Sequence, residues 1–399
     1  MIEGLRETIL KSATEGKDML SVIVGQEDAK KKILASLLAG HHVLIEGPPG
    51  VGKTTLAKHL AAALPAISAV KDCPYHCNPE APVCPQCRAK KIAGTKLEGI
   101  TIRVEQRFVR LQGSPDLTAE DLLGDIDPSQ AFKYGPQDYR AFIPGKLLKG
   151  NRGVVFFDEL NRVTEKLQNA LLQVLEEGIA TIGPYDVDYP ADFVMIATMN
   201  PRERAGVEEL SDVLLDRFDV VKMSYPETAE REREILLKHG LKMDNVKVPD
   251  KVIDSIVSLV RATREEPWIK EMDQSASVRA TLSLYEKVQA VALLEKRAEA
   301  TVDDIRKMAA SSLGSRLKPS PESKYYDSQL NLIEELLDVP DEKSMREKLK
   351  QHQSEITPEF MEILSTLVAR LEDGENAELR DHLKMLYGLA LQASMRASI

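Results

Sequence analysis

Residues 43–54, VLIEGPPGVGKT, combine the residue types and the spacing of a phosphate-binding loop. Gly47, Gly52, Lys53 and Thr54 match the pattern G-x-x-x-x-G-K-[ST] in full. Phosphate oxygens need inward-pointing backbone N–H groups, which glycines leave accessible, and the start of the following helix favours negative charge. Lys53 would place its charge on the β- and γ-phosphates, and Thr54 would offer a hydroxyl to Mg²⁺. The loop therefore predicts nucleotide binding.

Two carboxylates form a second chemical landmark, because Asp158 and Glu159 directly follow the apolar run 153–157. Such a run predicts a buried parallel strand, and ligands of open α/β sheets bind at the C-terminal edge of the strands. We expect Asp158 to hold Mg²⁺ through water and Glu159 to polarise the attacking water. The residues expected to contact the nucleotide are Gly47, Pro48, Pro49, Gly50, Val51, Gly52, Lys53, Thr54, Thr55 and Asp158.

These side chains need a sheet with helices packed on it. Leu56, Leu60 and Leu64 recur every four residues after the loop, which predicts a helix covering the sheet. A second helix is expected from Thr164 to its stop at Gly178. Residues 179–192 resemble a hairpin, with Gly183 and Pro184 near its turn. The apolar runs that predict strands are 43–45, 108–111, 154–157 and 193–198.

Three further features have an ordinary structural interpretation on the sequence alone, and two of them also have a functional one. Asn200 follows a strand at the same sheet edge, so its amide could orient the water, but an Asn-Pro pair also suits an ordinary turn. Arg217 lies among acids and apolar residues, which fits a surface ion pair. The apolar run 22–24 could cover an adenine ring or pack in the core.

All four cysteines of the chain lie within fifteen residues, and they suggest a metal site. Cys73, Cys77, Cys84 and Cys87 have the spacing C-x3-C-x6-C-x2-C, and His76 is a spare candidate ligand. We expect one Zn²⁺ that holds together a segment, 65–104, too poor in apolar residues for a core of its own. An iron–sulfur cluster, free thiols or disulfides remain alternatives.

Composition limits the classes of protein that fit. The chain of 399 residues is long enough for two or three domains, and its net charge of −10 argues against a large nucleic-acid surface. No apolar run reaches the roughly eighteen residues of a transmembrane helix, and the first residues do not resemble a secretion signal. The few cysteines suit a reducing cytoplasm.

Taken in order, these landmarks resemble the AAA+ ATPases of the MoxR and magnesium-chelatase subunit I group. The matching strings are EGPPGVGKTTLAKHLA (46–61), RLQGSPDLTAEDLLG (110–124), PGKLLKGNRGVVFFDE (144–159), DELNRVTEKLQNALLQVLEEG (158–178), FVMIATMNPRERAG (193–206), LLDRFD (214–219) and SVRATLSLYEKVQAVALLEKRAEATVDDI (277–305). Asn200 then corresponds to the sensor 1 asparagine, Arg217 to an arginine finger that reaches the neighbouring subunit's nucleotide, and Arg279 to the sensor 2 arginine.

The resemblance implies an α/β fold in which an αβα core with a parallel sheet precedes an all-helical lid. We place the core at 1–225, the lid at 226–318, a linker at 319–328 and a helical C-terminal extension at 329–399. The core carries the four-cysteine insertion (65–104) and an insertion within helix 2 (125–145). In this group, the helix 2 insertion and the hairpin at 180–191 usually face the pore of the ring or a partner.

The function that the resemblance implies is ATP hydrolysis by a hexameric ring that remodels a client. The client would be a protein or a metal-insertion complex, and the partner would carry a von Willebrand A domain. The cofactors would be Mg²⁺ and Zn²⁺, with ATP as the substrate. The alternative is a nucleic-acid motor of the replicative helicase type, but the hairpin carries Asp186 and Asp188 where tracking along DNA needs Lys or Arg. A non-hydrolysing switch is disfavoured by the complete set Lys53, Asp158 and Glu159.

Overall fold

The computed structural model describes most of the chain. It covers residues 2, 4–136, 138–182, 187–200 and 210–320. Towards the C-terminus it covers residues 332, 333, 336, 337, 339, 342–353, 356, 357, 360, 361, 363–365, 368 and 377–397. Among the helices of these residues, none combines the length and the hydropathy that a membrane crossing requires.

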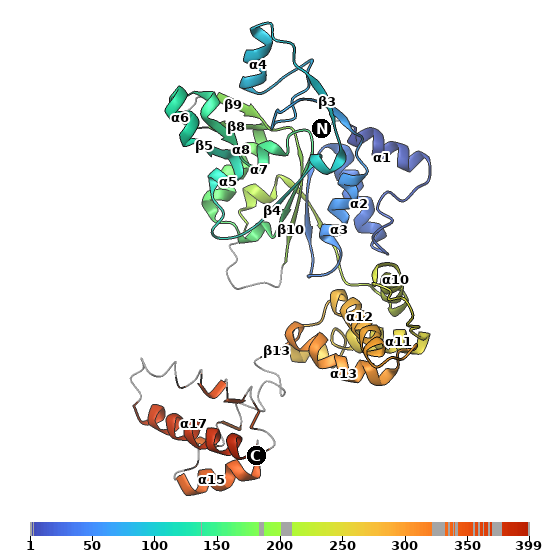
Figure 1. The fold of residues 1–399 in the computed structure, drawn as a ribbon, viewed down its shortest axis with the longest axis vertical. Helices are drawn as coiled ribbons and strands as arrows, with labels where there is room; N and C mark the ends of the chain where they lie inside the picture. Colours follow the sequence, from blue (N-terminus) through green and yellow to red (C-terminus); the bar gives the residue numbers. More distant parts are fainter. Residues whose placement is uncertain are drawn as a thin grey trace.

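A five-stranded parallel sheet forms the centre of the core (Figure 1). Across the sheet, the strands are β11 (Phe218–Lys222), β1 (His42–Glu46), β10 (Val194–Met199), β7 (Val154–Asp158) and β4 (Phe108–Gln112). Every neighbouring pair is parallel. The C-terminal ends of β1, β7 and β10 therefore meet at one edge, as an α/β nucleotide-binding fold requires.

Helices cover both faces of this sheet, and alternation along β7 shows why. Val154 and Phe156 are buried against α1 (Leu5–Thr14), α2 (Glu27–Ala39) and α3 (Lys53–Ala62). Val155 and Phe157 face the opposite layer, which contains α7 (Lys146–Lys149) and α8 (Glu165–Glu177). A strand buried on both faces has an uninterrupted apolar sequence, so the run 153–157 predicted this position correctly.

Three excursions from the core gather at one end of it, where Figure 1 shows α4, α6, β8 and β9 far from the lid helices. The four-cysteine insertion pairs β2 (Ile67–Val70) with β3 (Gly99–Ile102) and holds α4 (Pro85–Ile92) between them. The helix 2 insertion contains β5 (Gly124–Ile126), α6 (Pro128–Tyr134), η2 (Tyr139–Ala141) and β6 (Phe142–Pro144). The expected hairpin consists of β8 (Ile179–Ile182) and β9 (Val187–Pro190); Gly183 and Pro184 lie outside the described residues.

The lid packs its helices α10 (Ala229–His239), α11 (Asp250–Ala262), α12 (Val278–Leu294) and α13 (Val302–Leu313) around one shared apolar cluster. It also contains an antiparallel pair that the sequence did not predict, β12 (Met272–Gln274) with β13 (Lys318–Pro319). Ser320 N donates to the carbonyl of Glu271 at 2.9 Å. Residues 319 and 320, expected at the start of the linker, are therefore joined to the lid. Such pairing between distant segments leaves no local pattern in the sequence.

The C-terminal extension has an apolar cluster of its own. α15 (Glu342–Gln351) and α17 (Ala377–Ala397) contribute Met345, Leu349, Leu383 and Leu386 to it, together with Phe360 and Leu364.

Candidate nucleotide-binding site

The phosphate loop joins β1 to α3. Its backbone conformation and its close approach to a neighbouring segment explain why glycine occurs at two of its positions. Gly52 precedes the first residue of α3 with a φ of 98°, a left-handed conformation that side chains disfavour. Gly47 lies so close to the neighbouring strand segment that a Cβ would be 2.4 Å from the carbonyl oxygen of Met223. Lys53 opens α3, and its Nζ donates to the carbonyls of Gly47 at 2.5 Å and Pro48 at 3.2 Å. The ammonium is thus held over the loop that would cradle phosphates.

Thr198 of β10 ties the two acidic residues to the central strands. Its hydroxyl donates to Oδ1 of Asp158 at 2.8 Å and accepts from the backbone N of Glu159 at 3.0 Å. Glu159 has a φ of 57°, so the chain turns sharply at this position, directly after β7 ends. Asp158 is therefore the last residue of the strand, whereas Glu159 lies outside it.

Strand β4 supplies a partner to each carboxylate. Arg110 Nη2 lies 2.8 Å from Oδ2 of Asp158, and Gln112 Nε2 donates to Oε2 of Glu159 at 2.8 Å. Gly113, the residue after Gln112, also lies close to the acidic pair, because its backbone N donates to the carbonyl of Asp158 at 2.7 Å. A Cβ on Gly113 would be 1.9 Å from the carbonyl oxygen of Glu159, so a side chain there would displace the turn at Glu159.

A cavity of about 480 Å³ contains most of the predicted site residues. Its lining includes residues from the loop, the sheet edge and the lid: Pro49, Gly50, Val51, Gly52, Lys53, Thr54, Thr55, Asp158, Glu159, Asn200 and Arg279. Gly47 and Pro48 lie just outside the lining, where they hold Lys53. Val22, Ile23 and Val24 line the cavity together with Ile235 and Leu282 of the lid, so the apolar run has the surroundings that an adenine ring requires.

Arg217 lies outside that lining. Its Nη2 is 2.9 Å from Oε1 of Glu176, and its Nη1 is 3.3 Å from Oδ2 of Asp216. Within one chain, therefore, Arg217 makes the ion pairs that its acidic surroundings suggested.

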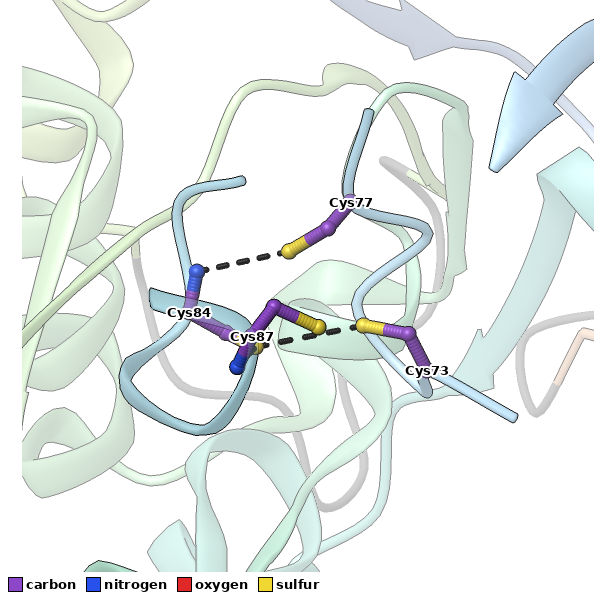
Figure 2. A group of neighbouring side chains, drawn as sticks. All are labelled: Cys73, Cys77, Cys84 and Cys87. Carbon is purple, nitrogen blue, oxygen red and sulfur yellow. Dashed lines mark hydrogen bonds between the residues drawn. The ribbon is translucent and has the colours of Figure 1, made fainter. Parts of the chain in front are cut away.

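The four cysteine thiols lie together (Figure 2), in the insertion whose helix α4 is far from the lid in Figure 1. Cys73 and Cys77 come from one loop, and Cys84 and Cys87 from the start of α4; all four are buried. Their sulfur atoms lie within 4.8 Å of one another, with 3.9 Å between those of Cys73 and Cys84. Tetrahedral zinc with Zn–S bonds near 2.3 Å requires sulfur separations of about 3.8 Å, so the donor set fits this metal.

Backbone N–H groups also point at the cluster, which suits sulfur atoms that carry negative charge. Cys84 N donates to Sγ of Cys77 at 3.3 Å, and Cys87 N donates to Sγ of Cys84 at 3.4 Å. Hydrogen bonds from the thiols of Cys77 and Cys84 lower the pKa of Cys73, whereas burial raises the pKa of Cys87 to about 12. Four thiolates buried this close together would need a cation to balance their charge. His76, the spare candidate, is not a member of the cluster.

Sequence reasoning missed Arg110, Gln112 and Thr198. Each belongs to a strand whose apolar neighbours dominate its pattern, and each reaches the acidic pair only through the register of the sheet. Gln112 pairs with Asp158, for example, across β4 and β7. The string RLQG contained two of these residues, but nothing local indicates which strand they adjoin.

The parallel sheet, the phosphate loop, the acidic pair at the same edge and the helical lid define the AAA+ class of ATPases. Family comparison agrees. Residues 90–220 match the ATPase family associated with various cellular activities, 18–74 match magnesium chelatase subunit ChlI, and 273–333 match an AAA lid domain.

Similarity to individual proteins narrows the class of AAA+ ATPase further. The chain is 30% identical to the uncharacterized protein YeaC of Bacillus subtilis over 78% of this chain and 88% of that one. It is 26% identical to a magnesium-chelatase subunit ChlI homolog of Methanocaldococcus jannaschii, over 75% and 86%. It is also 26% identical to the chaperone MoxR1 of Mycobacterium tuberculosis, over 74% and 72%.

The chain belongs to the MoxR and magnesium-chelatase subunit I group of AAA+ ATPases. It is accordingly an ATP-hydrolysing motor of the remodelling or chaperone type, with ATP as substrate and Mg²⁺ as cofactor.

Proposed function

We propose that ATP binds in the cavity between the phosphate loop and the lid, and that Lys53 contacts its β- and γ-phosphates. One observation carries the proposal: Lys53, Asp158, Glu159 and Arg279 line the same cavity although they come from separate segments. Thr54 and Asp158 are hard oxygen donors of the kind that Mg²⁺ prefers, so these two residues would hold the ion. When bound, Mg²⁺ neutralises charge on the phosphates.

Glu159 is the proposed base that polarises the attacking water, and Asn200 orients that water from the neighbouring strand. Arg279 lies in the first turn of α12, so it would sense the nucleotide from the lid. Because Arg279 is part of the lid, its contact with the nucleotide would couple hydrolysis to movement of the lid.

Arg217 is proposed to act across a subunit boundary in a hexameric ring. Its position outside the cavity supports action on the nucleotide of a neighbour, since it does not line the site of its own chain. Its partners Glu176 and Asp216 would keep it extended between turnovers. An arginine that completes a neighbour's site makes hydrolysis depend on assembly of the ring.

The four cysteines are proposed to bind one Zn²⁺ as a structural ion. Four buried sulfur donors close a tetrahedral site and leave no open position for chemistry. The cluster is absent from the lining of the nucleotide cavity, so the ion would stabilise the insertion rather than contact ATP.

The proposed client is a protein or a metal-insertion complex in the cytoplasm, presented by a partner with a von Willebrand A domain. The test is affinity capture from the native cell with Glu159→Gln, which should bind ATP and stay in the client-bound state. Lys53→Ala, which should lose ATP binding, is the matched control. Proteins enriched by both variants equally would contradict ATP-dependent client binding, and enrichment of nucleic acid would favour the helicase-type alternative.

A further inference from the structure

Tyr75 connects the four-cysteine insertion to the hairpin β8–β9 and, through it, to the helix 2 insertion. It lies between Cys73 and Cys77, and its ring stacks on Tyr189 of β9 at 5.3 Å between centroids and 14° between planes. Tyr189 in turn packs on Phe142 of β6, at 4.9 Å and 35°. We call these three residues the aromatic stack. None of them is more than 3% exposed.

A polar connection runs beside the aromatic stack. Asn151 Nδ2 donates to the carbonyl of Tyr75 at 2.8 Å, and Asn151 Oδ1 accepts from the backbone N of Asp192 at 3.0 Å. Arg152 Nη1 donates to the carbonyl of His76 at 2.7 Å. The backbone around Tyr75 is thus attached to the turn before β7 and to the segment that follows the hairpin.

Apart from these hydrogen bonds, few buried side chains fix the shape of the loop that holds Tyr75. Between residues 71 and 88, all of which are described, the buried side chains are Tyr75 and the four cysteines. No strand is assigned between β2 and β3, and α4 is the helix there. Apolar burial is too small to order such a loop, whereas a metal crosslink of four side chains supplies that order directly.

We propose that the four-cysteine metal site is the rigid base that positions the hairpin β8–β9 and the helix 2 insertion, through the aromatic stack and Asn151. The inference rests on the proposed zinc site. It assigns the ion a role beyond its own insertion: with metal bound, Tyr75 is fixed, and Tyr189 and Phe142 keep their places against it. Without metal, the hairpin β8–β9 and the helix 2 insertion both lose their packing against a fixed Tyr75. The contacts that hold the phosphate loop are unchanged.

Hydrogen-exchange mass spectrometry of the full chain, as purified and after removal of metal by a chelator, tests the proposal. Amides of residues 142, 143 and 187–189 should exchange about tenfold faster in stripped protein, because opening of these strands becomes easier. Residues 47–54 should exchange at an unchanged rate. Faster exchange confined to residues 67–102 would overturn the inference, whereas protein purified without metal would overturn the zinc assignment and this inference together.

Variants of Tyr75 test the aromatic stack with the metal in place. Tyr75→Ala should reproduce the faster exchange at residues 142, 143 and 187–189 with metal content unchanged. Tyr75→Phe should behave as wild type, since the Tyr75 hydroxyl is buried with no hydrogen-bond partner among the described residues. Tyr134→Ala removes an aromatic ring of the helix 2 insertion that contacts Lys133 and Arg140 instead, and it should leave β9 unaffected. Normal exchange in metal-loaded Tyr75→Ala would overturn the proposed route.

Discussion

The guanidinium of Arg110 lies 2.8 Å from the carboxylate of Asp158, the residue proposed to hold Mg²⁺. Arg110 is on β4, and Asp158 ends the adjacent strand β7, so the pair depends on sheet register. The guanidinium and a metal ion would compete for the same negative charge. Because the Arg110 side chain is 49% exposed, solvent screening keeps this pair weak enough to be displaced.

Arg110→Ala should therefore lower the Mg²⁺ concentration needed for half-maximal ATP hydrolysis. A partly exposed ion pair is worth under about 1 kcal/mol, which limits the shift to about fivefold. Titration of Mg²⁺ at saturating ATP measures it. Arg231→Ala, which removes an exposed pair with Glu234 on α10, is the control and should not change the requirement. An increased requirement would show that Arg110 supports the metal site.

Glu159→Gln should bind ATP and slow hydrolysis by about 10²–10⁴, because it removes the water-polarising group and leaves the phosphate loop intact. Lys53→Ala should lose ATP binding altogether. Equilibrium binding of a fluorescent ATP analogue and steady-state phosphate release separate the two effects. Normal turnover in Glu159→Gln would exclude Glu159 as the base.

Arg217→Ala should bind ATP normally and hydrolyse it slowly, since an arginine finger contributes roughly 10³–10⁵ to the rate. Mixing this variant with Glu159→Gln should restore part of the activity. In a mixed ring, one interface can combine an intact Glu159 with an intact Arg217. Full activity of Arg217→Ala alone would leave the residue with only its ion pairs to Glu176 and Asp216.

Purified protein should carry about one zinc per chain and be colourless. The double variant Cys84→Ser, Cys87→Ser should lose the metal and keep ATP binding, because the cluster is not part of the nucleotide cavity. His76→Ala is the matched control and should retain the metal. Elemental analysis decides the identity, and a brown protein absorbing near about 400 nm would indicate an iron–sulfur cluster instead.

Sequence reasoning was sufficient where a feature is local. The phosphate loop, the run before Asp158 and the hairpin at 179–192 each carry their pattern within about fifteen residues, and capping motifs mark helix starts. Thr118 and Asp121, three residues apart in the sequence, form such a capping box at the start of α5 (Ala119–Leu123), with both hydrogen bonds present. The α/β fold followed from these elements and from the family resemblance.

Features that depend on distant contacts were not predictable. The hydrophobic periodicity of residues 65–104 predicted no helix or strand. A segment held together at four clustered cysteines does not need an apolar stripe. The partners Arg110 and Gln112 depend on β4 adjoining β7, and Asn151 reaches Tyr75 across 76 residues. Each of these contacts is a consequence of tertiary packing.

The pairing of β12 with β13 determines through which residues a force on the C-terminal extension would reach the lid. Ser320, the last described residue of the lid side, is bonded to Glu271 beside β12, and the C-terminal extension follows it in the sequence. β12 ends at Gln274, three residues before Ser277, and a Cβ on Gly50 of the phosphate loop would lie 2.8 Å from the Ser277 hydroxyl. A pull on the extension would thus be shared between α13 and the strand leading to Arg279. Glu271, which accepts the hydrogen bond from Ser320, and Arg279, which is proposed to sense the nucleotide, lie on one short stretch of backbone.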